Sequence, residues 1–241
     1  MKSVKYEEKY MTILEHLQEL KQRILLTFLI FILVLSICII YTKEISFILQ
    51  QPALGIKFLQ LAPGEYLFVS VKVASYAAIF IISPLILYQI IQFISPGLTR
   101  KENKYVIPTS ICSLCLFFLG GIFSYKAIIP ITINFLIGYG SDVVEPVWSF
   151  EEYFNFISLT LLTTGICFQL PILQVILGIT NIVSWKEMLR KWKYITFIST
   201  IISAIITPST DPLTQILMSI TIIILYSCGI FIVKTLQKTT K

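Results

Sequence analysis

Two carboxylates lie beside cations in an otherwise apolar chain. Glu102 lies in the stretch F-I-S-P-G-L-T-R-K-E-N-K, residues 93–104, where three cations surround it. Glu19 lies in H-L-Q-E-L-K-Q-R, residues 16–23, four residues before Arg23. Two kinds of chemistry suit such residues. A carboxylate near a helix start can accept free backbone N–H groups, and a carboxylate four residues from an arginine on a helix can form an ion pair.

Helix capping is the simplest role for several of the acids. A capping box has the pattern Ser/Thr-x-x-Glu, in which the glutamate side chain accepts a backbone N–H at the helix start. Four segments fit this pattern: Thr12 to Glu15, Thr99 to Glu102, Ser149 to Glu152 and Ser184 to Glu187. Glu102 can therefore cap a helix that begins just after the Pro-Gly turn.

Glu19 belongs to a different pattern, because apolar residues recur around it at helical spacing. Ile13, Leu17, Leu20 and Ile24 fall on one face of a helix. Residues 1–23 are thus predicted to form an amphipathic inner segment that leads into the membrane, with Glu19 paired to Arg23. The segment is no targeting peptide, because its first 20 residues contain four glutamates.

The composition predicts a protein that crosses a membrane several times. Of the 241 residues, 56% are hydrophobic and 13% are charged, with a mean hydropathy of +0.84. A soluble domain has about 25% charged residues. The fold class expected is an all-α integral membrane protein, a single polytopic domain over residues 1–241 that forms a curved bundle of six helices in the lipid bilayer.

Six apolar runs are candidate spans, since a helix needs about 20 residues to cross the hydrocarbon. Their ranges are about 24–41, 73–94, 106–129, 154–179, 194–207 and 213–233. The fifth run is short, and the charge pattern is the reason to count it. With six spans, 15 of the 19 Lys and Arg residues fall on one side. The positive-inside rule then puts both termini on the cytoplasmic or stromal side.

The opposite side carries two sizeable loops, residues 42–72 and 130–153. Trp148 and Tyr153 in the second loop are expected at the membrane surface, as part of an aromatic belt. Pro84 and Pro171 interrupt the second and fourth spans and are expected to kink these helices.

Polar residues within the spans are few. Gln169 lies mid-way along the fourth span, where a polar side chain faces protein or water rather than lipid. Asp211 stands at a short turn before the last span, in a position typical of a helix cap, and Gln215 follows one turn later. Cys112 and Cys115 form a C-x-x-C pair, which we interpret as two small core residues rather than a redox or metal site.

No catalytic constellation is recognisable. The chain has no P-loop and no Gly-rich phosphate cradle, and its single histidine, His16, has no Ser/Asp partners in a recognisable arrangement. We therefore expect no enzyme activity, no cofactor, no metal site and no nucleic-acid partner.

Four motifs together resemble the TatC family, the multispanning receptor subunit of the twin-arginine protein translocase. They are His16-Leu-x-Glu19-Leu-Lys-x-Arg23, Phe93-Ile-x-Pro96-Gly-Leu-x-x-x-Glu102, Phe168-Gln169-x-Pro171, and Thr207-Pro208 through Asp211 with Gln215. The resemblance extends over roughly residues 10–235. The first two motifs are specific as a pair, and each alone is weak.

The resemblance implies a function as well as a fold. Members of the family recognise twin-arginine signal peptides of folded cargo, and the matching residues here are Glu19 and Glu102, flanked by Phe93, Pro96, Lys21 and Arg23. Desolvated carboxylates suit this task, because charge-assisted bonds to guanidinium groups are strong and directional. Capping and binding can coexist at Glu102, since a carboxylate has several acceptor sites.

The resemblance also implies partners. Family members assemble with single-span proteins of the TatA/TatB type, self-associate in a larger complex and use the proton gradient. Partner packing is assigned to Gln169, Asp211 and Gln215. Gln169 replaces a glutamate that is common in relatives, which leaves hydrogen bonding and removes a charge, and Lys21 replaces a common arginine.

Two alternatives remain open at this stage. The chain can also be interpreted as a secondary transporter of a small solute or ion, although it lacks the matching broken helices and mid-depth charges expected of one. The abundance of Ile and scarcity of Ala suggest AT-rich coding sequence, which favours a plastid thylakoid membrane over a bacterial plasma membrane.

Overall fold

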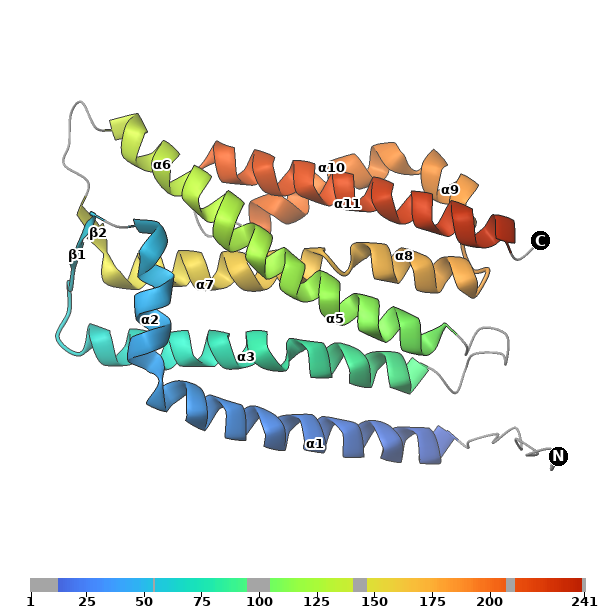
Figure 1. Ribbon diagram of the computed structural model, residues 1–241, viewed down its shortest axis with the longest axis horizontal. Helices are drawn as coiled ribbons and strands as arrows, with labels where there is room; N and C mark the ends of the chain where they lie inside the picture. Colours follow the sequence, from blue (N-terminus) through green and yellow to red (C-terminus); the bar gives the residue numbers. More distant parts are fainter. Residues whose placement is uncertain (1–12, 54, 95–104, 141–146, 207–210, 240–241) are drawn as a thin grey trace.

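The computed structural model describes residues 13–53, 55–94, 105–140, 147–206 and 211–239. These residues form a helical bundle whose long helices run side by side, while α5 and α6 cross them obliquely (Figure 1). The long helices overlap the predicted spans, and most of their ends lie close to the predicted ends. Five are long and apolar enough to cross a membrane, and α10 is a shorter apolar helix. The expected all-α membrane bundle is confirmed.

The first two long helices pack against each other. Helix α1 (Ile13–Ile40) has 28 residues and α3 (Glu65–Ile94) has 30. At 1.5 Å per residue α1 is about 42 Å long, which exceeds the ~30 Å hydrocarbon core. The predicted inner segment is therefore continuous with the first span from residue 13 onward. Among the long helices, α1 packs chiefly against α3.

The third span is longer than predicted. Helix α5 (Val106–Phe123) continues through a π-helical turn, η3 (Ser124–Ile128), into α6 (Ile129–Gly140). Residues 130–140 were expected in a loop and are helical instead. The π turn offers the reason, because it absorbs one extra residue per turn just before Pro130 and so lets the helix continue past the proline.

The fourth span is divided at Gln169. Helix α7 (Phe150–Cys167) ends two residues earlier, and α8 (Leu170–Ile179) begins one residue later with Pro171 in its first turn. A proline has no N–H to continue the ladder of α7, so the break follows from Pro171. In contrast, α3 remains helical through Pro84, and a kink there stays a prediction.

The last part of the chain returns twice across the bundle. Short helix α9 (Trp185–Arg190) leads into α10 (Trp192–Ile206), and α11 (Pro212–Thr239) runs back. Because of this return, the start of α1 and the end of α11 lie at the same end of the bundle (Figure 1). At the start of α9 the predicted capping box of Ser184 and Glu187 is confirmed. Hydrogen bonds from the backbone and side chain of Ser184 lower the pKa of Glu187.

The other three predicted capping boxes have different outcomes. Ser149 accepts a hydrogen bond from the Glu152 backbone at 3.5 Å, and no reciprocal bond from the Ser149 backbone to Glu152 is found among the described residues. The Thr12–Glu15 and Thr99–Glu102 patterns each include a residue outside the described part of the chain. Glu102 as a cap therefore stays a prediction.

The opposite end of the bundle is closed by the two connecting segments. The first contains α2 (Thr42–Gln50), the single turn η1 (Gln51–Ala53) and strand β1 (Lys57–Leu59). Strand β1 pairs in parallel with β2 (Val147–Ser149), with Phe58 opposite Trp148. These strands were not expected from the sequence, because each has only three residues.

Tyr153 lies in the core at this end and not in an interfacial belt. Its side chain is buried and its hydroxyl donates to the Leu49 carbonyl oxygen at 2.8 Å. It belongs to a cluster that joins α3, α6 and α7. The expected belt position is wrong for Tyr153, because the buried hydroxyl has a partner inside the protein.

The C-x-x-C pair also differs from its interpretation. Cys112 and Cys115 are both free and exposed on α5, so they are not core residues. Residues three apart lie on one helix face, and this face points away from the bundle.

Small residues allow close packing between α8 and α11, as is common between membrane helices. A Cβ at Gly229 would lie 2.7 Å from Cδ of Gln174 and 3.1 Å from the Pro171 Cα. By contrast, a Cβ at Gly138 would meet nothing within 4 Å.

The substitution Gly229→Ala is therefore expected to lower the free energy of unfolding by about 1–3 kcal/mol, because α8 and α11 must separate. The control Gly138→Ala should be neutral or slightly stabilising, since alanine favours helix over glycine. Thermal unfolding of both variants in the same detergent measures the difference. Equal melting temperatures would contradict the packing described.

Candidate functional site

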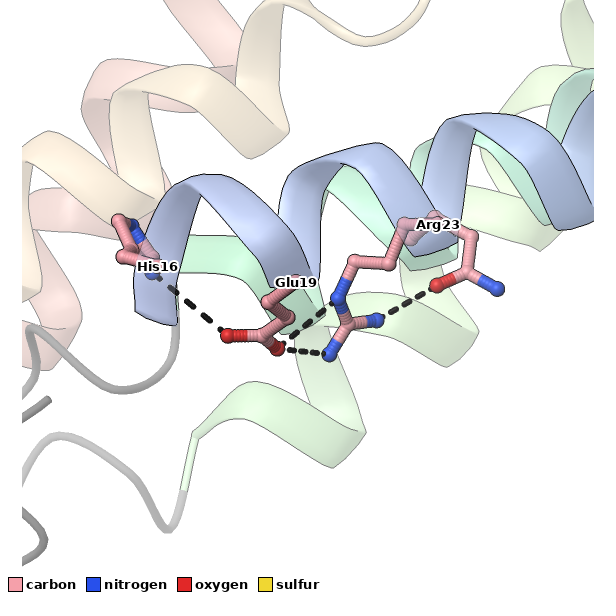
Figure 2. A network of polar contacts seen from close by, with 4 residues as sticks. His16, Glu19 and Arg23 are labelled. Atoms are coloured by element: carbon pink, nitrogen blue, oxygen red, sulfur yellow. Dashed lines mark hydrogen bonds and ion pairs between the residues drawn. The ribbon is translucent and has the colours of Figure 1, made fainter. Parts of the chain in front are cut away.

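A polar network joins α1 to α3 near the start of α1 (Figure 2). The Arg23 guanidinium donates two hydrogen bonds to Oε1 of Glu19, from Nε at 3.0 Å and from Nη2 at 2.6 Å. Its third nitrogen, Nη1, donates to Oε1 of Gln89 at 2.5 Å. Arg23 therefore links the carboxylate on α1 to an amide on α3. The predicted ion pair of Glu19 and Arg23 is confirmed.

The second carboxylate oxygen of Glu19 has a different environment. Oε2 is buried and accepts no hydrogen bond from the part of the chain that the structure describes. Nδ1 of His16 lies 3.6 Å from it. The His16 ring stacks on Phe93 of α3, with centroids 4.1 Å apart and planes 8° apart. Glu19 thus has one oxygen that accepts both Arg23 bonds and a second oxygen that lies near the stacked His16 ring.

Helix periodicity explains why these side chains meet. His16, Glu19 and Arg23 are spaced by three and four residues, which puts them on one face of α1. Gln89 and Phe93 are four residues apart on α3 and face them. Lys21 lies two residues from Glu19, and it is exposed on another side of α1.

The predicted site residues are therefore brought together in part. Glu19, Arg23 and Phe93 meet, and Lys21 does not join their network. Pro96 and Glu102 lie outside the described residues. Sequence reasoning missed Gln89 and gave His16 no role in the site. One signal could have found Gln89, since it is a polar residue in an apolar run, one helical turn before Phe93.

Gln169 makes its contacts inside the protein. It is buried, its Oε1 accepts a hydrogen bond from the Ser113 hydroxyl at 2.6 Å, and its Nε2 donates to the Ser113 carbonyl oxygen at 3.1 Å. The expectation that this residue avoids lipid is confirmed. Its assignment to partner packing stays a prediction, and the amide already bridges α5 to the break between α7 and α8.

Asp211 caps α11. Its buried carboxylate accepts the Thr214 backbone N–H at 2.8 Å and also the Thr214 hydroxyl. That hydroxyl lies 3.0 Å from the hydroxyl of Thr132 on α6. Gln215 donates a long hydrogen bond of 3.4 Å to the Thr200 carbonyl of α10. These contacts hold α11 to its neighbours, and the assignment of Asp211 and Gln215 to partner packing remains a prediction.

Glu65 is a structural carboxylate that the sequence did not single out. It is buried at the start of α3. Its Oε2 accepts the backbone N–H groups of Leu61 and Ala62 at 2.6 and 3.0 Å, and its Oε1 accepts that of Glu151 at 3.1 Å. Glu65 thereby fastens the β1 segment to the start of α7, at the end of the bundle opposite Glu19.

Within the described residues, no group of three His, Cys, Asp or Glu side chains could hold a metal ion. The Glu19 network offers one carboxylate oxygen, Oε2, and an aromatic stack beside an apolar helix pair. This arrangement suits recognition of a cationic side chain through a carboxylate.

A sequence profile of the Sec-independent protein translocase protein (TatC) matches residues 15–220. This chain belongs to the TatC family. The match includes both Glu19 and Gln169. It begins within the first turn of α1 and ends within α11, most of which lies beyond it.

Individual relatives agree with the profile. The tatC-like protein ycf43 of Gracilaria tenuistipitata var. liui is 59% identical over 228 residues, which are 95% of this chain and 96% of that protein. The chloroplastic Sec-independent protein translocase protein TATC of Pisum sativum is 41% identical over 95% of this chain and 65% of its own length.

A crystal structure titled as the twin-arginine translocase receptor TatC in detergent has the same fold. It is 32% identical, with a TM-score of 0.82 over 90% of this chain and 99% of that one. The TatC fold and the multi-pass membrane character of this chain are thus established.

The hydrogen bonds of Gln169 predict an energetic coupling to Ser113. The double variant Ser113→Ala with Gln169→Leu should cost less than the sum of the single variants, by about 0.6 kcal/mol, because each single change leaves a partner unpaired. Unfolding of the isolated chain in detergent, without other subunits, measures the four free energies. Strict additivity would show that the bond between the Ser113 hydroxyl and Gln169 Oε1 does not stabilise the protein.

Proposed function

We propose that this chain is the receptor of a Sec-independent twin-arginine translocase. It binds Arg-Arg signal peptides of folded proteins, with Glu19 and Glu102 as the binding carboxylates. One observation carries the proposal. Glu19 already binds one guanidinium through Oε1, and among the described residues its Oε2 accepts no hydrogen bond. A guanidinium that takes the place of His16 beside Oε2 gains a charge-assisted bond.

The surroundings of Glu19 support selectivity for arginine. Arg23 and Gln89 fix the carboxylate, so a ligand meets an oriented acceptor. A planar guanidinium can also stack on the Phe93 ring, which a lysine ammonium does less well. Phe93, Pro96, Lys21 and Arg23 complete the proposed binding region, and Pro96 and Glu102 follow directly after α3 in the sequence.

The proposed topology follows from the positions of the cations. The side with the start of α1 and the end of α11 is the cytoplasmic or stromal one, because most Lys and Arg residues belong to it. This orientation puts Glu19 on the side where cargo is made. The membrane is proposed to be the plastid thylakoid, in keeping with the chloroplastic relative, and a bacterial plasma membrane is the alternative.

Assembly with single-span partners of the TatA/TatB type, self-association and proton-gradient-driven export are also part of this proposal. They are supported by membership of a translocase family. The same membership favours translocation of proteins over transport of a small solute.

The test is the affinity of a fluorescent Arg-Arg signal peptide for the chain in nanodiscs. Glu19→Gln should weaken binding at least tenfold, since hydrogen bonds to charged groups are worth about 1.5–3 kcal/mol. A Lys-Lys peptide should bind equally weakly to the wild type and the variant.

Glu15→Gln is the matched control, because Glu15 is exposed on α1 one turn before Glu19. It should change the affinity by less than about twofold, because Glu15 is not part of the network of Glu19, Arg23 and Gln89. An equal loss of affinity in both variants would mean that peptide binding depends only on the net charge at the start of α1. Unchanged binding in a folded Glu19→Gln protein would remove Glu19 from the site.

A further inference from the structure

Cations gather at one corner of the bundle, where α9 lies beside the last part of α11 (Figure 1). The segment W-K-E-M-L-R-K-W-K-Y, residues 185–194, contains four cations and one acid, and α11 adds Lys234 and Lys238. The acid, Glu187, is engaged in the capping box of α9. None of the six cations forms an ion pair with a described residue. The corner therefore has an excess of positive charge.

Two of these cations, from different helices, meet at one indole ring. Nζ of Lys186 on α9 lies 5.8 Å from the centroid of the Trp185 ring, and Nζ of Lys234 on α11 lies 5.2 Å from it. The indole N–H of Trp185 has no acceptor among the described residues, so it is a further donor for a ligand. Because two ammonium groups near one ring repel each other, an anion beside them is favoured.

Hydrogen bonds hold Trp185 in place between three helices. Its backbone N–H donates to Oε1 of Gln237 on α11 at 3.2 Å, and Nε2 of Gln237 donates to the Gly178 carbonyl oxygen of α8 at 3.0 Å. The Tyr226 hydroxyl of α11 donates to the Met188 carbonyl oxygen of α9 at 2.8 Å. Trp185 also packs on a buried apolar cluster formed by α8, α9 and α11. The two lysines therefore meet at a ring whose position is fixed by the fold.

The surface of α11 next to the cations is apolar. Phe231 lies three residues before Lys234 on the same helix face, and Ile224 lies about two turns further toward the middle of the span. Both side chains are exposed. Trp192 and Tyr194 are exposed at the start of α10, and such aromatic residues are common at the level of lipid headgroups. Along α11 the cations are thus followed by an apolar face, which is the order of groups that a headgroup and its acyl chains require.

We propose that this corner binds an anionic phospholipid. Lys186, Lys234 and the indole N–H of Trp185 contact its phosphate, and its acyl chains lie along the exposed face of α11. Clusters of Lys and Arg at the ends of membrane helices attract anionic lipids. A soluble polyanion would use the cations alone, whereas a lipid also covers the apolar face that begins at Phe231.

The experiment uses the full chain in phosphatidylcholine nanodiscs that contain a small fraction of phosphatidylglycerol with a photoreactive acyl chain. Adducts are mapped by mass spectrometry and are expected on residues 224–235 of α11. They should exceed the adducts of an equal amount of photoreactive phosphatidylcholine at least fivefold, on the order of the attraction of one or two cations for an anionic headgroup. Equal labelling of this segment by the two lipids would overturn the inference.

A double variant provides a second measurement. Lys186→Gln with Lys234→Gln should weaken binding of phosphatidylglycerol to the chain in detergent about tenfold, since each cation near an anionic headgroup contributes severalfold. Native mass spectrometry measures the affinity. The control, Lys43→Gln with Lys57→Gln, removes the same charge from exposed residues at the opposite end of the bundle. It should change the affinity by less than about twofold, because charges beyond the Debye length are screened.

The outcomes distinguish a lipid site from two simpler explanations. Equal losses of affinity in both double variants would mean that only the net charge of the protein attracts the lipid, and would overturn the site. Glycerol phosphate has the same phosphate without acyl chains, and an excess of it should leave phosphatidylglycerol bound. Full displacement by glycerol phosphate would identify a soluble phosphate ester as the ligand and would overturn the inference. No peptide is present, so the result does not depend on the proposed signal-peptide binding.

Discussion

A carboxylate at the edge of a membrane is stable only when it is paired, because an isolated charge loses its hydration there. Glu19 meets this constraint through Arg23 on its own helix and, through Arg23, Gln89 on α3. The pairing ties the start of α1 to the end of α3. It leaves Oε2 without a hydrogen bond from the described residues, and Oε2 is the acceptor that we propose for a ligand.

The remainder of the bundle holds α1 and α3 in their positions. At the far end, Glu65 collects three backbone N–H groups from two segments, and β1 pairs with β2. In the interior, Gln169 binds Ser113, and Asp211 caps α11. The side chains of Gln169 and Asp211 thus have partners within the protein, as the absence of water in hydrocarbon requires of buried polar groups. Helix α1 packs chiefly against α3, and the Glu19 network lies between these two helices.

Much of this structure could be predicted from the sequence. The lengths of the apolar runs predicted the positions of the long helices. The i,i+4 spacing of Glu19 and Arg23 predicted their ion pair. The Ser-x-x-Glu pattern at residues 184–187 predicted a capping box, and the structure contains a complete one. Local patterns of this kind succeed because their physics depends on neighbours in the chain.

What the sequence could not predict depends on tertiary contacts. Gln89 joins the site because α1 faces α3, and its place one turn before Phe93 does not by itself reveal that contact. The helical extension to residue 140 depends on a π turn, and the strands depend on pairing between residues about 90 apart. Tyr153 was misplaced for the same reason, since its partner, Leu49, is distant in sequence.

The central claim is that Glu19 binds an arginine of the ligand. The most direct test is a solid-state NMR distance between the ¹³C-labelled side-chain carboxyl of Glu19 and ¹⁵N-labelled guanidinium groups present only in a bound Arg-Arg peptide. The account predicts a dipolar coupling that corresponds to about 4 Å, the distance of an ion pair. No coupling in a saturated complex would mean that Glu19 binds only Arg23, and would contradict the account.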